Sequence, residues 1–185
     1  MVYEIEKRAR VTPQEIGRCM KFLEEQGQYF GEKEMKTFLF MNPIYLRVRL
    51  IKNQDEVLVT NKQGGYEDKA RKETQIDLPY KQLKPFIQLM QLLGFKECAS
   101  WNTQREFYRL NGLNVEMSKS EHLGNILEVE ALTTQQIDIG KLEKKVRDTL
   151  RILKLKEIDA KEYQKMMDEL YKKTLKPISQ HSFTI

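Results

Sequence analysis

The sequence predicts an α+β protein built on a closed antiparallel β-barrel, or tunnel, of about eight strands. Its interior is expected to be charged, with amphipathic helices packed outside. Two observations support this fold. Strand-like segments outnumber helical ones along the chain, and runs of strands broken by helices are typical of antiparallel α+β folds. Several strands also carry like charges on one face, which a closed barrel can turn inward.

The length and the lack of an internal linker predict one domain, residues 1–173, followed by a weakly ordered C-terminal tail, residues 174–185. Hydrophobic residues make up 40% of the chain and charged residues 32%, which is a globular composition. The net charge of +5 suits an anionic ligand. It does not distinguish among nucleotide, polyphosphate, nucleic acid and acidic protein.

The two cysteines, Cys19 and Cys98, lie far apart and in no ligand-like spacing. This argues for a reducing compartment and against a disulfide scaffold or a thiolate zinc site. No signal peptide is expected, because the N-terminus becomes charged within a few residues, and the longest apolar runs are too short to cross a bilayer. We therefore expect a soluble cytoplasmic protein without a membrane partner. His181, in the polar tail, is expected to face solvent.

The first strand candidate, residues 2–11, is followed by the best-marked helix. Thr12 and Glu15 form a capping box around Pro13, and Gly27 ends the helix. The other helices are expected in residues 80–93, in residues 140–153, and from Asp159 onward, where Glu162 completes a second capping pattern. The other strand candidates are residues 35–41, 43–52, 55–62, 68–78, 96–102, 104–112, 113–119 and 125–133.

Side chains alternate between the two faces of a strand, so the first strand places Glu4, Glu6, Arg8 and Arg10 on one face. For any single strand, such a pattern is ordinary, because an antiparallel sheet often has one solvated face. The same-sign pairs recur, however, as Arg47 and Arg49 and as Glu128 and Glu130.

Like charges two residues apart on one face repel each other unless a group of opposite charge lies between them. A divalent cation relieves this repulsion in a Glu-x-Glu pair. A phosphate chain relieves it in an Arg-x-Arg pair, because arginine forms bidentate hydrogen bonds with phosphate. The candidate metal ligands are all carboxylates, which favours Mg²⁺ or Mn²⁺ over zinc or iron.

These residues resemble the CYTH superfamily, also called triphosphate tunnel metalloenzymes, and most closely its short members similar to class IV adenylyl cyclases. The N-terminal Glu-x-Glu-x-Lys signature is matched by residues 4–8, with Arg8 in place of the lysine. The Leu-Arg-x-Arg strand is matched by residues 46–49. The later matches follow in the family's order at Lys62, Arg71 and Glu73, Arg105 and Tyr108, and the run from Leu123 to Glu130.

The resemblance implies a set of site residues. It implies that the metal is held by Glu4, Glu6, Glu128 and Glu130. It implies that the triphosphate is bound by Arg8, Arg10, Arg47, Arg49, Lys62, Arg71, Glu73 and Arg105. It implies catalytic roles for Glu4, Glu6, Glu130 and Lys62.

The function that this resemblance implies is metal-dependent hydrolysis of inorganic triphosphate, ATP or thiamine triphosphate. A class IV adenylyl cyclase, which makes cyclic AMP and pyrophosphate, is the alternative, ranked second because the sequence shows no adenine pocket. A non-catalytic polyphosphate or nucleotide-binding protein is a further alternative. It is motivated by Ser118, Thr103 and Gln75, which stand where the family often has aspartate, lysine and glutamate.

The expected oligomeric state is a monomer or homodimer. We do not expect nucleic acid as a partner. Trp101 and Tyr108 could stack on bases, but lone aromatic residues in strands more often belong to the core.

Overall fold

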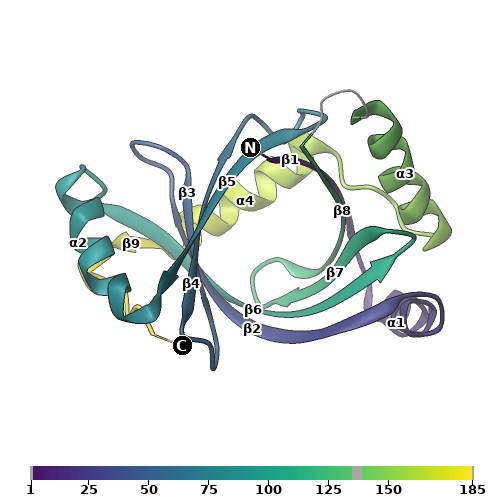
Figure 1. The fold of residues 1–185 in the computed structure, drawn as a ribbon, viewed down its shortest axis with the longest axis horizontal. Helices are drawn as coiled ribbons and strands as arrows, with labels where there is room; N and C mark the ends of the chain where they lie inside the picture. The colour runs from purple at the N-terminus through teal and green to yellow at the C-terminus, as the bar shows by residue number, and fades with distance from the viewer. Residues whose placement is uncertain (1, 135–138, 185) are drawn as a thin grey trace.

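The computed structural model of the protein describes residues 2–134 and 139–184. Within these residues, eight strands form one closed antiparallel barrel in the order β2-β3-β4-β5-β1-β8-β7-β6, and β6 pairs back with β2 (Figure 1). The predicted α+β barrel is confirmed. The strands are β1 Val2–Arg10, β2 Gln28–Phe40, β3 Leu46–Ile51, β4 Glu56–Gln63, β5 Arg71–Pro79, β6 Glu97–Leu110, β7 Leu113–Ser120 and β8 Gly124–Thr133. A short strand, β9 Leu175–Pro177, pairs with β6.

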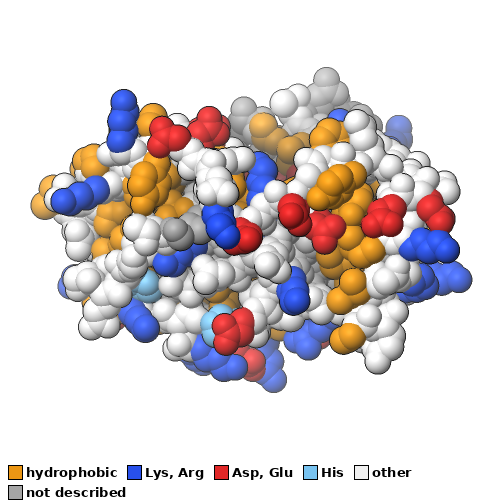
Figure 2. Space-filling view, turned by 90° about the horizontal axis from the view of Figure 1, so that it is seen from below, with side chains coloured by type: hydrophobic (Ala, Val, Ile, Leu, Met, Phe, Trp, Pro, Cys, Tyr) orange, Lys and Arg blue, Asp and Glu red, His pale blue; other side chains and the backbone are white. Residues whose placement is uncertain are grey.

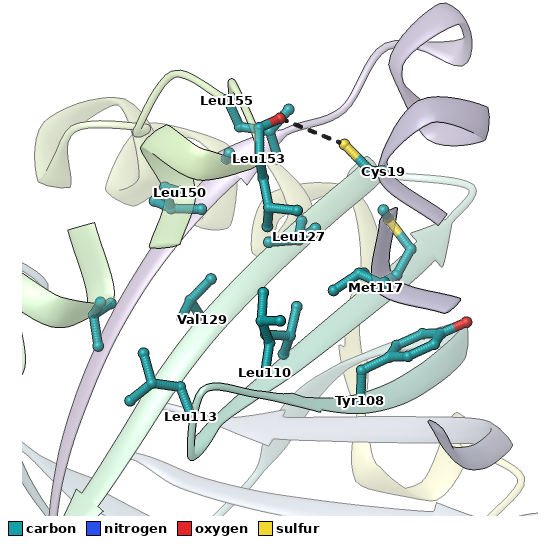
Figure 3. Close-up of a cluster of buried hydrophobic side chains, with 14 of the residues drawn as sticks. Cys19, Tyr108, Leu110, Leu113, Met117, Leu127, Val129, Leu150, Leu153 and Leu155 are labelled. Carbon is teal, nitrogen blue, oxygen red and sulfur yellow. Dashed lines mark hydrogen bonds between the residues drawn. The ribbon is translucent and has the colours of Figure 1, made fainter. Parts of the chain in front are cut away.

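The apolar faces of the strands point outward and are covered by helices on two opposite sides of the barrel (Figure 1). On one side, Leu127 and Val129 of β8 pack with Cys19 and with Leu150 and Leu153 (Figure 3). Cys19 lies on α1 and Leu150 on α3, and Leu153 directly follows α3. The helices are α1 Pro13–Gln26, α2 Leu83–Leu92, α3 Ile139–Ile152 and α4 Ala160–Thr174.

On the other side, α2 places Leu83, Ile87 and Met90 against Val48 of β3 and Val57 of β4. The positions of α1, α2 and α3 thus follow from their own apolar stripes, because the outer faces of the strands that they cover are apolar. The barrel is therefore stabilised from outside while its interior remains free for polar groups.

The first helix forms as its sequence predicts. The Thr12 amide donates to Glu15 Oε2 at 2.9 Å, and the Thr12 hydroxyl donates to the same oxygen at 2.7 Å. At the C-terminal end, the Gly27 amide donates to the Leu23 carbonyl at 2.9 Å. A Cβ atom at Gly27 would lie 2.7 Å from that carbonyl oxygen, so only glycine fits there.

The fourth helix, α4, packs against residues from the inside of the barrel rather than against its outer wall. Tyr163 and Met167 of α4 cluster with Trp101 of β6 and Ile126 of β8, and all four line the interior cavity. Helix α4 therefore covers one end of the barrel and helps to enclose its contents.

Two strands extend beyond their predicted limits. β2 begins at Gln28 instead of residue 35, and β6 is one continuous strand where two were predicted. The N-terminal half of β2 is too polar to show an apolar alternation, and it is a strand because it pairs with β6 from Gln28 to Leu39. Long-range pairing of this kind leaves no local sequence pattern.

The prediction of a weakly ordered tail is wrong for residues 174–184, whereas residue 185 lies outside the described residues. Besides β9, the segment forms a 3₁₀ turn, Ile178–Gln180. Phe183 stacks on Phe38 with ring centroids 4.4 Å apart. His181 is not a solvent residue, because its Nε2 atom lies 2.8 Å from the Cys98 carbonyl oxygen and its Nδ1 atom 3.2 Å from the Ser100 hydroxyl.

No helix in the described part of the chain combines the length and the apolar character that crossing a membrane requires.

Removal of the Phe183 ring tests whether this segment belongs to the core. We expect Phe183→Ala to lower the free energy of unfolding by about 2 kcal/mol, less than a fully buried phenylalanine because the ring is half-buried. Urea denaturation measures the change. The neighbouring Thr184→Ala should change it by less than about 0.5 kcal/mol. Equal effects of the two substitutions would show that the segment does not stabilise the fold.

Candidate active site

The interior of the barrel is lined by charged side chains from seven strands. Residues that lie opposite each other on paired strands share a face of the sheet. These side chains share the inner face, as Glu6 does with Glu130 and Lys62 does with Glu73. The lining residues are Glu4, Glu6 and Arg8 of β1, Arg47 and Arg49 of β3, Lys62 of β4, Arg71 and Glu73 of β5, Arg105 of β6, Glu116 of β7, and Glu128 and Glu130 of β8.

Three of the predicted metal ligands come together. Glu4, Glu6 and Glu130 each offer one carboxylate oxygen, and these oxygens lie within 4.8 Å of one another. We call these three residues the acidic trio. Carboxylate oxygens suit Mg²⁺ and Mn²⁺, so the trio fits the divalent cation that the resemblance implies.

Cationic side chains compensate two members of the acidic trio. Lys62 Nζ donates to Glu4 Oε1 at 2.6 Å and lies 3.2 Å from Glu73. Arg71 pairs with both Glu4 and Glu6. Burial alone would raise the pKa of the Glu4 carboxyl, but the charges of Lys62 and Arg71 lower it to about 2.

The third member of the trio differs. Burial, together with the charge of Glu4, raises the pKa of Glu130 to about 7, although the Asn114 amide donates to Glu130 at 2.9 Å. Two like charges this close disfavour full ionisation, so the trio retains a proton near neutral pH. A divalent cation bound to the trio would offset the repulsion between the carboxylates, so Glu130 could release that proton.

A second set of residues, all arginines, lines a small enclosed cavity of about 40 Å³ next to the trio. They are Arg8, Arg47, Arg49, Arg71 and Arg105. At roughly 10–15 Å³ for each water, this cavity holds a few water molecules. A triphosphate can enter only if some of these side chains exchange their present partners for phosphate oxygens.

Arg47 and Arg49 are the least satisfied members of this set. Their Nε atoms are buried and have no hydrogen-bond partner among the described residues. Burial, with the charges of Arg47 and Arg105, lowers the pKa of Arg49 to about 9. Buried polar groups without partners are rare, so these two atoms indicate that an anion belongs beside them.

Arg8 and Arg105 have acidic partners. Arg8 Nε donates to Glu128 at 2.6 Å, and Arg105 pairs with Glu116. Arg8 also lies over the Tyr163 ring, 4.2 Å from its centroid. Neighbouring Arg8 keeps the pKa of Glu128 well below its usual range despite burial.

The structure does not bring every predicted residue into one site. Glu128 is engaged with Arg8 rather than grouped with the acidic trio. Arg10 is exposed on the rim, with its Nε atom 3.7 Å from Glu162 of α4. Gln75 is exposed as well.

The sequence did not indicate several interior residues, among them Glu116, Tyr66 and Tyr163. Glu116 is a single acid on its strand, so it did not form the same-sign pair that revealed the others. Tyr66 lies in a loop and Tyr163 on a helix, where strand alternation gives no information. The Tyr66 ring lies beside Arg71, with its centroid 5.0 Å from the guanidinium group.

A closed antiparallel barrel with a carboxylate cluster and arginines inside defines a class of charged-tunnel proteins. The sequence model of the CYTH domain matches residues 3–163. The chain belongs to the CYTH family, as the resemblance predicted. No curated protein matches it.

Solved structures share the fold over most of the chain. The PH1012 protein of Pyrococcus horikoshii OT3 is 27% identical with a TM-score of 0.67, over 83% of this chain and 91% of that chain. The PH1819 protein of the same organism is 20% identical with a TM-score of 0.75, over 90% and 98%. A Vibrio parahaemolyticus protein proposed to be an adenylate cyclase is 12% identical with a TM-score of 0.71, over 90% and 98%. The last two comparisons show the fold alone.

The proton on Glu130 predicts a pH-dependent affinity for metal. With a pKa of about 7, Glu130 is mostly protonated at pH 6 and mostly ionised at pH 8. Mg²⁺ should therefore bind about tenfold more tightly at pH 8, because at pH 6 the cation must displace a proton. Calorimetric titration at the two pH values measures the ratio.

The same group affects stability. A carboxyl whose pKa is raised on folding stabilises the fold fully at pH values below its pKa in the unfolded chain. For Glu130, this contribution is lost as the pH rises through about 7. Mg²⁺ should therefore raise the melting temperature more at pH 8 than at pH 6, and Glu130→Gln should abolish that difference. A metal effect independent of pH in the unaltered protein would contradict the assignment.

Proposed function

We propose that the protein is a divalent-metal-dependent enzyme that hydrolyses triphosphate-containing substrates inside its barrel. The observation that carries this proposal is the pair of buried Nε atoms of Arg47 and Arg49, which have no hydrogen-bond partner in the described part of the chain and lie beside a cluster of three carboxylates. A site with unsatisfied arginine donors and grouped acids calls for an anion and a cation together. A metal–triphosphate complex supplies both.

The number of cations favours a chain of phosphates over a single anion. Arginines from β1, β3, β5 and β6 line the same cavity, and Lys62 reaches the acidic trio beside it. A linear triphosphate carries several negative charges and can accept bidentate hydrogen bonds from successive guanidinium groups. Burial lowers the pKa of Arg49, and binding of the anion would offset the repulsion from Arg47 and Arg105 that lowers it further.

The acidic trio would hold Mg²⁺ or Mn²⁺. When bound, the metal offsets the charge of the phosphate oxygens and the charge that develops as the phosphoryl group is transferred. Lys62 and Arg71, which pair with the trio, would then be free to donate to phosphate oxygens instead. Glu128, outside the trio, would act as a positioning residue that orients Arg8.

In the hydrolytic reaction, water attacks the terminal phosphorus, the bond from that phosphorus to the bridging oxygen breaks, and phosphate and a diphosphate leave. The proton that the water loses passes to a phosphate oxygen and then to solvent. The arginines stabilise charge on the equatorial and leaving oxygens without changing protonation state. Such positioning and charge stabilisation account for most catalysis of phosphoryl transfer.

Adenylyl cyclase activity is the second candidate. It is favoured by a cavity of about 510 Å³ that is lined in part by Glu128 and Glu130, which leaves room for a nucleoside next to the trio. In that reaction, a ribose hydroxyl attacks the α-phosphorus and pyrophosphate leaves.

The face of the molecule shown in Figure 2 does not favour nucleic acid as the substrate. On the face shown in Figure 2, Lys and Arg side chains are interspersed with Asp and Glu side chains. We also propose a cytoplasmic location, which the free and buried state of Cys19 and Cys98 supports.

The deciding assay offers inorganic triphosphate, ATP and thiamine triphosphate with Mg²⁺ or Mn²⁺, and measures phosphate, pyrophosphate and cyclic AMP. We expect phosphate from inorganic triphosphate. Cyclic AMP from ATP would establish the cyclase instead. Tight binding of triphosphate with no product would establish a binding protein.

Substitution of Arg49 tests the phosphate contact. Loss of one charge-assisted hydrogen bond costs about 1.5–3 kcal/mol, so Arg49→Met should lower kcat/KM for inorganic triphosphate by a factor of ten to a hundred or more. Arg151→Met is the matched control, because Arg151 is exposed on α3 and pairs with Asp148 alone among the described residues. Equal activity of the two variants would remove Arg49 from the site.

A further inference from the structure

We propose that the end of the barrel not covered by α4 binds the aromatic base of a nucleoside triphosphate, with Phe30 and Phe107 as the stacking surface. This inference rests on the proposed function and names the substrate class of the same site. It was not visible in the sequence, where no base pocket could be recognised.

The base would occupy the 510 Å³ cavity, which we call the mouth. Its volume lies within the range of roughly 300–1,000 Å³ of small-molecule sites. Phe30 lies near the start of β2, Arg109 near the end of β6, Asn114 near the start of β7 and Glu130 near the end of β8. In an antiparallel barrel, these positions share one end, and α4 packs at the other.

A β-bulge in the pairing of β2 with β6 sets the position of Phe30 at the mouth. Tyr29 pairs with Tyr108 and Gly31 pairs with Phe107, so Phe30 is the extra residue between two paired positions. Gly31 adopts a left-handed φ of 109°, as the glycine of such a bulge requires. Tyr29 packs on Tyr108 with ring centroids 5.1 Å apart, whereas the Phe30 side chain lines the mouth.

An exposed phenylalanine alone is ordinary. Phe30, however, is 58% exposed and shares its cavity with a second ring, Phe107. Each ring also has a cation beside it. The Arg109 guanidinium lies 5.9 Å from the Phe30 centroid, and Lys33 Nζ lies 5.8 Å from the Phe107 centroid. Aromatic rings in a positively charged groove, with arginine among the cations, are a usual platform for nucleobases.

The mouth continues into the phosphate site. Glu128 lines both the mouth and the arginine cavity, and Glu130 belongs to both the mouth and the acidic trio. A nucleotide with its base on Phe30 would therefore place its α-phosphate near Glu130 and its terminal phosphate toward the arginines. Base, metal and triphosphate then follow one another along the barrel.

The test compares ligands with and without a base. Binding of a non-hydrolysable ATP analogue and of inorganic triphosphate, each with Mg²⁺, is measured by calorimetry for the unaltered protein, Phe30→Ala, Phe30→Trp and Leu92→Ala. We expect Phe30→Ala to weaken binding of the ATP analogue about tenfold, within the range for loss of one base–aromatic stack. Binding of inorganic triphosphate should change by less than about twofold, because the phosphate contacts remain.

The other variants separate stacking from loss of structure. Phe30→Trp should keep the affinity for the analogue, because it restores an aromatic face. Leu92→Ala, at an exposed apolar residue of α2, should change neither ligand. Equal weakening of both ligands by Phe30→Ala, or no weakening of either, would overturn the base site.

The two proposals fail in different ways. Binding of the analogue through Phe30 without release of phosphate from any substrate would overturn the hydrolase and keep the base site. Hydrolysis of inorganic triphosphate, with an ATP analogue bound no better in the unaltered protein than in Phe30→Ala, would do the opposite. Failure of the unaltered protein to bind either ligand would overturn both.

Discussion

The barrel depends on the compensation of charges that are held away from water. A buried ion without a partner costs several kcal/mol, so an interior acid either pairs with a cation or, like Glu130, retains a proton. The sheet registers supply some of the cationic partners, since Glu4 lies opposite Arg71 and Lys62 lies opposite Glu73. The interior is therefore a set of exchangeable ion pairs, and a metal–phosphate complex would replace these partners rather than fill an empty space.

Alternation along strands made much of this predictable. It fixed which side chains share a face, and the recurrence of same-sign pairs showed that several faces are charged. Apolar residues between them, such as Val48 and Val129, showed that the opposite faces need a cover, which α2 and α3 provide. The fold and most interior residues follow from this local information, together with the order of the family motifs.

What the sequence could not show depends on contacts between distant segments. The polar start of β2 is a strand because β6 lies beside it, and Phe30 faces the mouth because of a bulge in that pairing. The division of the acids into a trio and an arginine partner also follows from three-dimensional proximity, because Glu128 and Glu130 have the same local pattern. The tail looked unstructured since its few apolar residues, such as Phe183, gain their partners in the folded chain.

The pairing of β1 with β8 has a consequence for how the protein is made. Tyr3 pairs with Thr133, so the first strand waits for a partner synthesised more than a hundred residues later. Strand pairs this distant fold slowly, because the chain loses entropy before the contacts form. Before β8 leaves the ribosome, β1 can pair with β5 alone, through residues 2–4. The charged interior is therefore completed late, when β8 joins β1, and a nascent chain lacking β8 has no complete site.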